Sequence, residues 1–337
     1  MKLGLLGPIA WRTPPRHYGP WELVTGLLAD GLAARGVDVT LFATLDSVTG
    51  AQLDGVCPRP YQEDADADGR IWEALHVAHA LRSADENGFD LIHNHLDWLP
   101  LAFSSLTDTP MVTTIHGFSS PRILPAYQGS DSAFVSISDA DRSSELSYVA
   151  TVHHGVDVSQ LPFSPDGGES LVCFGRIHPD KNTAQAVEIA RRAGRPLILC
   201  GPIQDESYFA REIEPHVDEV SVRYCGSVGP EQRAAILGTA ACVLHPIAFA
   251  EPFGLSVVES MLCGTPVVAA PRGSMPEVVD EGITGVLADG VEAAVAGVER
   301  AVRLDRAACR AQAERRFNSD RMVEDYLRVY ERVLEAQ

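Results

Sequence analysis

The sequence lacks the features of a secreted or membrane-spanning protein. No span approaches the roughly 20 apolar residues that a membrane helix needs. The first residues, MKLGLLGPIAW, have neither the long apolar segment nor the small-residue cleavage site of a signal peptide. The seven cysteines are odd in number, form no CxxC pair and mostly lie in apolar runs, as buried free thiols do. We therefore expect a cytoplasmic protein.

Positive charge is also scarce. The chain has 27 Lys and Arg against 46 Asp and Glu, a formal net charge of −19. Such a chain is not expected to bind nucleic acid or anionic lipid as a general partner. If it binds an anionic ligand, it must gather its few cations in one place, so the positions of Arg and Lys are informative.

The sequence contains no GxGxxG fingerprint, which disfavours a Rossmann dehydrogenase. Apolar strand-like runs nevertheless alternate with helical patterns, and the rhythm restarts after a Pro- and Gly-rich segment at 159–168. This predicts an α/β fold with two domains. A helix is expected at 21–35, and amphipathic helices are expected from after Gly285 to the end, including one at 319–334. Strands are expected at 2–8, 37–44, 91–95, 111–117, 133–138 and 151–154, then at 170–175, 196–201, 220–226, 241–247 and 266–271.

Residues 251–279, EPFGLSVVESMLCGTPVVAAPRGSMPEVV, are the most informative stretch. They read as a turn, a helix and a strand after an apolar run, so the turn lies at the carboxyl end of a parallel strand, where ligands bind. Two acids, Glu251 and Glu259, flank the turn and the first part of the helix. They could be ordinary helix acids favoured by the dipole. The first amides of the helix, from Gly254 on, would form an anion site.

The segment EPFGLSVVE, from Glu251 to Glu259, resembles the E-x7-E signature of retaining glycosyltransferases of the GT-B fold, especially family 4. GTPVV at Gly264 and GSMPEVV at Gly273 extend the resemblance. It implies two Rossmann-like lobes with the active site in the cleft between them. The implied parts are an acceptor domain at 1–158, a linker at 159–168, a donor domain at 169–317 and a helix at 318–337 that returns to the first lobe.

One pair of cations stands out in FGRIHPDKN. Arg176 follows Gly175 at a strand end, and Lys181 lies near the start of the next helix, where a cation opposes the dipole unless an anion is present. A guanidinium fork and an ammonium suit a diphosphate. They could instead be surface cations paired with Asp180 and Glu188. The resemblance implies that both bind the donor diphosphate.

The same resemblance implies roles for further residues. Glu259 would hold the nucleotide ribose, Glu251 would contact the donor sugar, and His116 would lie near that sugar. From the residues alone, His116 could be a buried histidine satisfied by backbone, Ser138 a helix cap, and the loop at 7–20 a solvated surface loop. The implied catalytic residues are His116, Glu251, Arg176 and Lys181. The implied donor site adds Gly175, Gly226, Ser227, Val228, Phe253, Gly254, Leu255, Ser256 and Glu259. The implied acceptor site contains Arg16, Tyr18, Gly19, His95 and Ser138.

Two patterns suggest metal sites that we do not expect to form. The acidic run at 63–69 contains D-x-D and matches the first half of an EF-hand loop, but the twelfth position is Leu75 instead of Glu. His93, His95 and Asp97 alternate, which could place them on one side of a strand as metal ligands. Such residues more often line a crevice or cap a helix.

The expected activity is metal-independent transfer, with retention, from a nucleotide diphosphate sugar to a small soluble acceptor. UDP is the commonest carrier in the family, and compact members glycosylate antibiotics and other secondary metabolites. No cofactor or metal is expected, and the oligomeric state is open. The alternatives are a nucleotide-sugar epimerase or hydrolase and a non-catalytic two-lobed sugar-binding protein. His154 stands where the family usually has Asn, which puts that contact in doubt.

Overall fold

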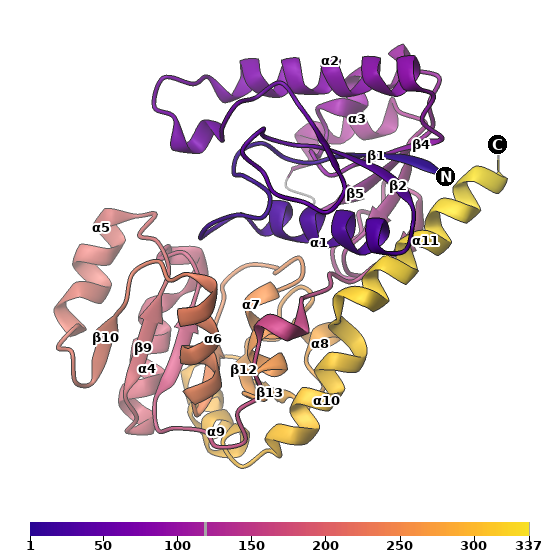
Figure 1. Ribbon diagram of the computed structural model, residues 1–337. Coiled ribbons are helices and arrows are strands. Elements are labelled where there is room, and N and C mark those ends of the chain that lie inside the picture. Colours follow the sequence, from indigo (N-terminus) through magenta and orange to yellow (C-terminus); the bar gives the residue numbers. More distant parts are fainter. Residues whose placement is uncertain (118–119, 337) are drawn as a thin grey trace. The chain divides into compact units, whose positions relative to one another are not determined.

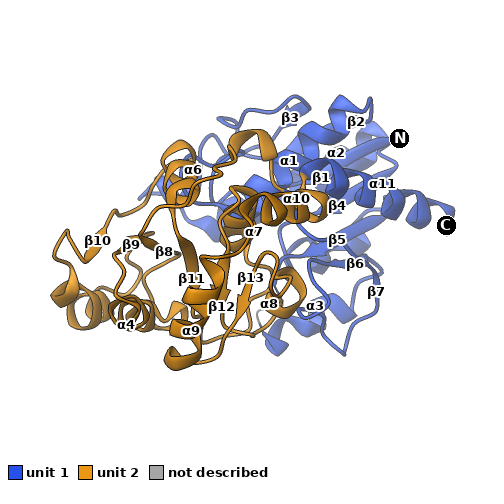
Figure 2. Ribbon diagram, turned by 90° about the horizontal axis from the view of Figure 1, so that it is seen from below, with its two compact units in different colours: residues 1–155, 319–337 blue, residues 156–318 orange. Residues whose placement is uncertain are grey.

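The computed structural model describes residues 1–117 and 120–336. The chain divides into one unit of residues 1–155 and 319–337 and a second unit of residues 156–318 (Figure 2). Residue 337 itself lies outside the described residues. The chain leaves the first unit after Gly155 and comes back to it at Ser319.

The first unit is built on a parallel sheet. Its strands are β1 (Lys2–Leu6), β2 (Asp38–Phe42), β3 (Gln52–Asp54), β4 (Leu91–Asn94), β5 (Met111–Ile115), β6 (Ala133–Ser136) and β7 (Tyr148–Thr151), and its α-helices are α1 (Pro20–Ala34), α2 (Gly69–Asn87), α3 (Leu124–Gln128) and α11 (Ser319–Glu335). The sheet order is β3-β2-β1-β4-β5-β6-β7, and each neighbouring pair is parallel. In Figure 1, α2 and α3 cover one face of this sheet and α1 and α11 the other.

The last helix, α11, belongs to the first unit because of its apolar stripe. Met322, Val323, Tyr326, Val329 and Tyr330 recur at helical spacing and are all buried. The stripe packs beside α1 (Figure 1).

The second unit repeats the plan. Its strands are β8 (Leu171–Phe174), β9 (Leu197–Cys200), β10 (Val222–Tyr224), β11 (Cys242–His245), β12 (Val267–Ala269) and β13 (Gly285–Leu287), and its α-helices are α4 (Thr183–Ala193), α5 (Glu206–Tyr208), α6 (Pro230–Thr239), α7 (Leu255–Leu262), α8 (Met275–Val278), α9 (Val291–Ala301) and α10 (Arg306–Phe317). The order is β10-β9-β8-β11-β12-β13, again with parallel neighbours. Helix α4 packs against α9, and α7 against α10.

Three expectations about elements were wrong. Strands β3 and β13 were not predicted, and each is a strand of three residues at a sheet edge. The strand expected at 151–154 is instead β7, at Tyr148–Thr151. Strand β7 is also an edge strand, and the register of its pairing with β6 shifts between Phe134 and Val135. Pairing with a single neighbour therefore sets its position more than its own sequence pattern does.

The Pro- and Gly-rich segment at 159–168, expected as a linker, is bonded into the second unit. The Ser164 amide donates to the Cys263 carbonyl at 3.2 Å, and the Gly168 amide donates to the Thr239 carbonyl at 2.8 Å. Arg306 Nε donates to the Ser164 carbonyl at 2.8 Å. These bonds satisfy backbone groups that a free linker would leave to solvent.

Each sheet has one point where the order of its strands reverses, between β1 and β4 in the first unit and between β8 and β11 in the second. Ligands of open parallel sheets bind at the carboxyl ends of the strands beside this point. The loops after β8 and β11 carry Arg176, Lys181 and Glu251, and the loop after β1 is the one at 7–20.

No helix in residues 1–117 and 120–336 is long and apolar enough to cross a membrane.

Candidate active site

In the second unit, the loops after β8 and β11 bring Lys181 and Glu251 together. Lys181 Nζ donates to Glu251 Oε2 at 2.8 Å. The same oxygen lies 3.3 Å from His245 Nε2, at the end of β11, within ion-pair distance but not aligned as a hydrogen bond. The side chains of Lys181, Glu251 and His245 are only 16%, 12% and 4% exposed. Lys181 and His245 therefore meet on one nearly buried carboxylate oxygen of Glu251.

The charge of Glu251 is fixed by this contact set. Burial opposes its ionisation, but the contacts with His245 and Lys181 outweigh burial and lower its pKa to about 2. Glu251 is therefore a carboxylate at neutral pH, not an acid that could donate a proton.

Backbone contacts explain how Lys181 reaches Glu251. The Ala248 amide donates to the Asp180 carbonyl at 2.8 Å, and Asn182 Nδ2 donates to the Pro246 carbonyl at 3.1 Å. A Cβ at Gly175 would lie 3.6 Å from Lys181 Cδ, so the lysine stem crosses the end of β8. Both loops are thus joined to each other by contacts within the protein.

Arg176 lies at the same strand end. It directs Nη2 to Asp180 Oδ2 at 3.1 Å and Nη1 to Gln204. His178 Nδ1 also contacts Asp180, at 2.7 Å from Oδ1. Burial raises the pKa of Asp180, but these neighbours together bring it below its usual value. The expected diphosphate cations, Arg176 and Lys181, are thus each paired with an acid of their own unit.

The turn before α7 is tightly supported. Gly254 takes a φ of 89°, where a Cβ would lie 2.6 Å from the Met275 side chain. Ser274 donates its amide to the Glu251 carbonyl at 2.8 Å and its hydroxyl to the Phe253 carbonyl at 3.0 Å. Helix α7 begins at Leu255, so the amides of Leu255 and Ser256 lie in its first turn, where no intrahelical acceptor exists.

Glu259 is buried inside α7 and pairs with a residue that sequence reasoning missed. Arg233 Nη1, from α6, lies 3.0 Å from Oε1 and 3.3 Å from Oε2 of Glu259. Nothing in the pattern of α6 distinguishes Arg233 from a surface arginine, so no local feature could have found the pair.

The turn after β10 contains the predicted donor-site residues Gly226, Ser227 and Val228. Gly226 adopts a φ of 67°, and its carbonyl accepts from the Gly201 amide at 2.8 Å. Val228 is buried. The turn is therefore fixed to the end of β9.

In the first unit, the predicted residue His116 belongs to a row of four buried histidines. His95 Nδ1 lies 2.9 Å from His116 Nε2, and His95 Nε2 lies 3.2 Å from His93 Nδ1. On the other side, His116 Nδ1 lies 3.3 Å from His154 Nε2. Trp21 stacks on the His116 ring with 5.2 Å between centroids. His95, expected to contact the acceptor, is instead fully buried between His116 and His93.

Burial lowers the pKa of each ring in the row, that of His116 to about 3 and those of His93, His95 and His154 well below their ordinary value. All four are neutral at physiological pH. Asp97 lies apart from the row because β4 ends at Asn94 and Asp97 takes a φ of 61°, from which its carboxylate accepts from the Tyr127 hydroxyl. The expected alternation of His93, His95 and Asp97 therefore ends before Asp97.

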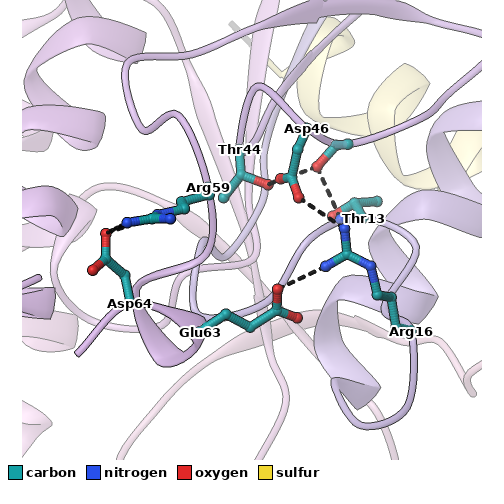
Figure 3. Close-up of polar contacts among 8 residues, drawn as sticks. Thr13, Arg16, Thr44, Asp46, Arg59, Glu63 and Asp64 are labelled. Carbon is teal, nitrogen blue, oxygen red and sulfur yellow. Dashed lines mark hydrogen bonds and ion pairs between the residues drawn. The ribbon is translucent and has the colours of Figure 1, made fainter.

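The other predicted acceptor residues are Arg16, Tyr18, Gly19 and Ser138, and each has its own local surroundings. Arg16 pairs with Glu63 at 2.6 Å and Asp46 at 3.4 Å (Figure 3). Tyr18 is exposed and meets the Trp11 ring edge-on at 6.4 Å. Gly19, at a φ of 149°, precedes α1. The Ser138 hydroxyl accepts from the Asp141 amide at 3.1 Å, but residues 139–147 form turns and no helix, so this bond closes a turn.

The acidic run at 63–69 forms local contacts. Asp64 pairs with Arg59 at 2.8 Å (Figure 3), and Asp68 accepts from the Arg70 amide at 3.0 Å to begin α2. Within the described residues, no group of three or more His, Cys, Asp or Glu side chains is arranged to hold a metal ion.

Known protein families match residues in both units. Residues 22–160 match the family described as Glycosyltransferase Family 4, and residues 160–316 match Glycosyl transferases group 1. The glycogen synthase of Mycobacterium tuberculosis is 26% identical over an alignment that covers 94% of this chain and 90% of the relative.

Two solved structures share the fold. AviGT4, a glycosyltransferase involved in avilamycin A biosynthesis, superposes with a TM-score of 0.80 over 100% of this chain and 99% of its own, at 24% identity. HepE of Anabaena, in complex with UDP and glucose, gives a TM-score of 0.75 over 98% of this chain and 99% of its own, at 20% identity. The chain belongs to the family 4 glycosyltransferases, and its two Rossmann-like units have the GT-B fold, which confirms the resemblance predicted from EPFGLSVVE.

Proposed function

We propose that this glycosyltransferase moves a sugar from a UDP-sugar to a small soluble acceptor, with retention of configuration and without a metal ion. The observation that carries the proposal is the cluster of Lys181, Glu251 and His245 beside Arg176 at the strand reversal of the second unit. UDP is proposed because HepE, which has the same fold, was solved with UDP and glucose. Retention rests on the family resemblance, and the sequence favours the cytoplasm as the place of action.

In the proposed reaction, the bond between the anomeric carbon and the β-phosphate oxygen breaks, and the acceptor oxygen bonds to that carbon. The acceptor proton leaves with the diphosphate. Negative charge grows on the diphosphate, where Arg176, Lys181 and the first amides of α7 would stabilise it. To do so, each cation must exchange its present carboxylate partner for a phosphate oxygen. These groups supply the positive charge that a metal supplies in other transferases.

Donor binding is tested first with a thermal-shift panel of nucleoside diphosphates and their sugars, because a ligand that binds the folded state raises the melting temperature. UDP and one UDP-sugar should give the largest shifts. Calorimetry should show weaker UDP binding by Arg176→Ala. Equal affinity in wild type and Arg176→Ala would contradict the diphosphate assignment.

The reaction class is tested by an NMR time course. With donor and acceptor, the product should keep the anomeric configuration of the donor, and added EDTA should leave the rate unchanged. With donor alone, a transferase leaves the sugar largely intact, whereas an epimerase or hydrolase consumes it. Rapid conversion of the donor without acceptor would therefore replace the proposed activity.

For the acceptor, we propose a small secondary metabolite, supported by the likeness to AviGT4. The net charge of −19 disfavours a surface of anionic lipid. A panel of small hydroxylated metabolites should yield product, whereas glycogen and anionic vesicles carrying glycolipid acceptors should not. Product formed on glycogen alone would overturn the choice of acceptor.

A further inference from the structure

The buried histidines of the first unit are connected to hydroxyl groups on its last helix. His93 Nδ1 lies 2.7 Å from the Tyr330 hydroxyl, and His93 Nε2 lies 2.8 Å from Thr114 Oγ1. Thr114 Oγ1 in turn lies 2.7 Å from the Tyr326 hydroxyl. Tyr326 and Tyr330 are both on α11 and fully buried. A continuous row of polar atoms therefore runs from α11 to His116. We name the set His93, His95, His116 and His154 the histidine row.

A neutral imidazole has one N–H donor and one nitrogen acceptor, so each ring fixes the role of its neighbour. If His95 accepts at Nδ1, then it must donate at Nε2, and His93 must accept at Nδ1. The ring contacts of the histidine row join Nδ1 of one ring to Nε2 of the next. One choice of tautomer at one end therefore sets all four.

The Tyr330 hydroxyl decides between the two possible orders. A buried neutral phenol next to an imidazole nitrogen is the natural donor, because the nitrogen lone pair is the better acceptor. Burial raises the pKa of Tyr330 well above its ordinary value, so the hydroxyl keeps its proton. Tyr330 then donates to His93 Nδ1 at 2.7 Å, and the same lone pair receives the longer contact from His95 Nε2–H at 3.2 Å. His93 Nε2 donates to Thr114 Oγ1. Thr114 has its own proton left to donate to Tyr326.

We propose that Tyr330, acting through His93 and His95, holds His116 as the neutral Nε2–H tautomer with its Nδ1 lone pair directed away from His95. His93, His95 and Tyr330 are thus positioning residues, and they contact no substrate. The catalytic consequence of the fixed His116 tautomer rests on the proposed function, in which positive charge develops at the anomeric carbon. Both nitrogens of His116 are engaged by His95 and His154, so a single tautomer fixes the direction of the ring dipole. A neutral ring with a fixed dipole does not repel the developing charge, whereas an imidazolium or a ring of mixed tautomers would be less favourable.

The tautomers can be read directly, without any assay of activity. Long-range proton–nitrogen NMR spectra of protein labelled with ¹⁵N-histidine distinguish protonated from unprotonated ring nitrogens, and single substitutions assign the rings. In the wild type, all four rings of the histidine row should be Nε2–H. An Nδ1–H tautomer at His116 would overturn the proposal outright.

Tyr330→Phe removes the donor at the end of the row while keeping the ring. The His116 signals should then report both tautomers. Tyr127→Phe is the matched control, because it deletes another buried hydroxyl of the same unit that bonds to Asp97 outside the histidine row. An unchanged His116 tautomer in Tyr330→Phe would refute the role of Tyr330. If this variant does not fold, Thr114→Val, which removes the acceptor of His93 Nε2–H, makes the same test.

Kinetics then decide whether the tautomer matters. With about half of the molecules in the wrong tautomer, kcat of Tyr330→Phe should fall about twofold, with KM for the donor unchanged. Tyr127→Phe should keep the wild-type kcat. A shifted tautomer with unchanged kcat would refute the positioning role. If the wild type transfers no sugar at all, the proposed function fails, while the NMR spectra still decide whether Tyr330 sets the tautomer of His116.

Discussion

Lys181 Nζ lies 2.8 Å from Glu251 Oε2, although 70 positions separate the two residues. The Lys181 ammonium lies beside the Glu251 carboxylate, which stays ionised because its pKa is about 2. A bound diphosphate would compete with Glu251 for this ammonium. The first prediction follows from that competition.

The sequence contains only two lysines, Lys2 and Lys181, so ¹³C-dimethylation gives two lysine NMR signals beside that of the N-terminal amine. UDP should shift the signal of Lys181, because a diphosphate alters its electrostatic surroundings, and leave that of Lys2 unchanged. Lys181→Met should weaken UDP binding by about tenfold to a hundredfold, the worth of a hydrogen bond to a charged group. Calorimetry measures the affinity.

Lys2→Met is the control, since Lys2 Nζ donates to the Asn87 carbonyl in the first unit. A shift at both lysines, or an equal loss of affinity in both variants, would show that Lys181 has no special place in the site.

A second prediction concerns the close approach of Gly273 to Glu251. A Cβ at Gly273 would lie 2.3 Å from both the amide nitrogen and the carbonyl oxygen of Glu251, so Gly273→Ala must displace the backbone of that residue. Gly282→Ala is a matched control, because Gly282 also has a positive φ, 80° against 57°, while its Cβ would meet no described atom within 4 Å.

Both variants should lose about 1–2 kcal/mol from the left-handed backbone alone. Urea unfolding should show a larger loss for Gly273→Ala, and only this variant should lose turnover. Equal stability and equal turnover of the two variants would mean that the backbone of Glu251 can move without effect.

The third prediction concerns Arg233 and Glu259, an ion pair of the second unit. Arg233→Met leaves the carboxylate of Glu259 buried without this partner, and the free energy of unfolding should fall. The double variant Arg233→Met/Glu259→Gln should recover part of the loss. A double-mutant cycle in urea should give a coupling of about 1–3 kcal/mol. Additive losses would show that the contact contributes nothing to stability.

The fourth prediction uses Glu22, a buried acid in the first turn of α1 that sequence reasoning did not select. Glu22 is 3% exposed, and Trp11 donates its amide to Oε1 at 3.0 Å. Burial, only partly offset by the backbone hydrogen bonds of Glu22 and Trp11, raises its pKa from 4.5 to about 7. The unfolded chain therefore releases this proton at lower pH than the folded protein, and stability falls as pH rises from 4.5 to about 7.

Glu22→Gln removes this loss, because Gln cannot ionise and its amide oxygen can still accept from Trp11. The free energy of unfolding of Glu22→Gln minus that of wild type should be about 3 kcal/mol larger at pH 8 than at pH 4. Urea unfolding at the two pH values measures it. Glu86→Gln, at an exposed site of α2, serves as the control and should track the wild type at both pH values. If the unfolding free energies of Glu22→Gln and wild type changed with pH in parallel, the titrating proton would belong to a group other than Glu22.

Local sequence pattern was enough for most of the fold. Alternating strand and helix patterns predicted β1, α1, β4 and β5 close to their observed bounds. It was not enough for β3, β13 and the position of β7, because short edge strands are fixed by hydrogen bonds to one neighbour and carry little periodicity of their own. Pro and Gly at 159–168 predicted a break in regular structure, but they did not indicate that the segment bonds to the second unit.

The sequence by itself determined the α/β class, the family and the identity of the candidate donor residues, since periodicity and the motif from Glu251 to Glu259 are properties of neighbouring positions. Only the tertiary structure decided which side chains meet. Lys181 contacts Glu251, Arg233 contacts Glu259, and Tyr330 contacts His93 across 237 positions. Parallel strands bring the loops of Lys181 and Glu251 to one edge of a sheet, and packed helices carry Arg233, Glu259 and Tyr330. A pattern along the chain does not record these approaches.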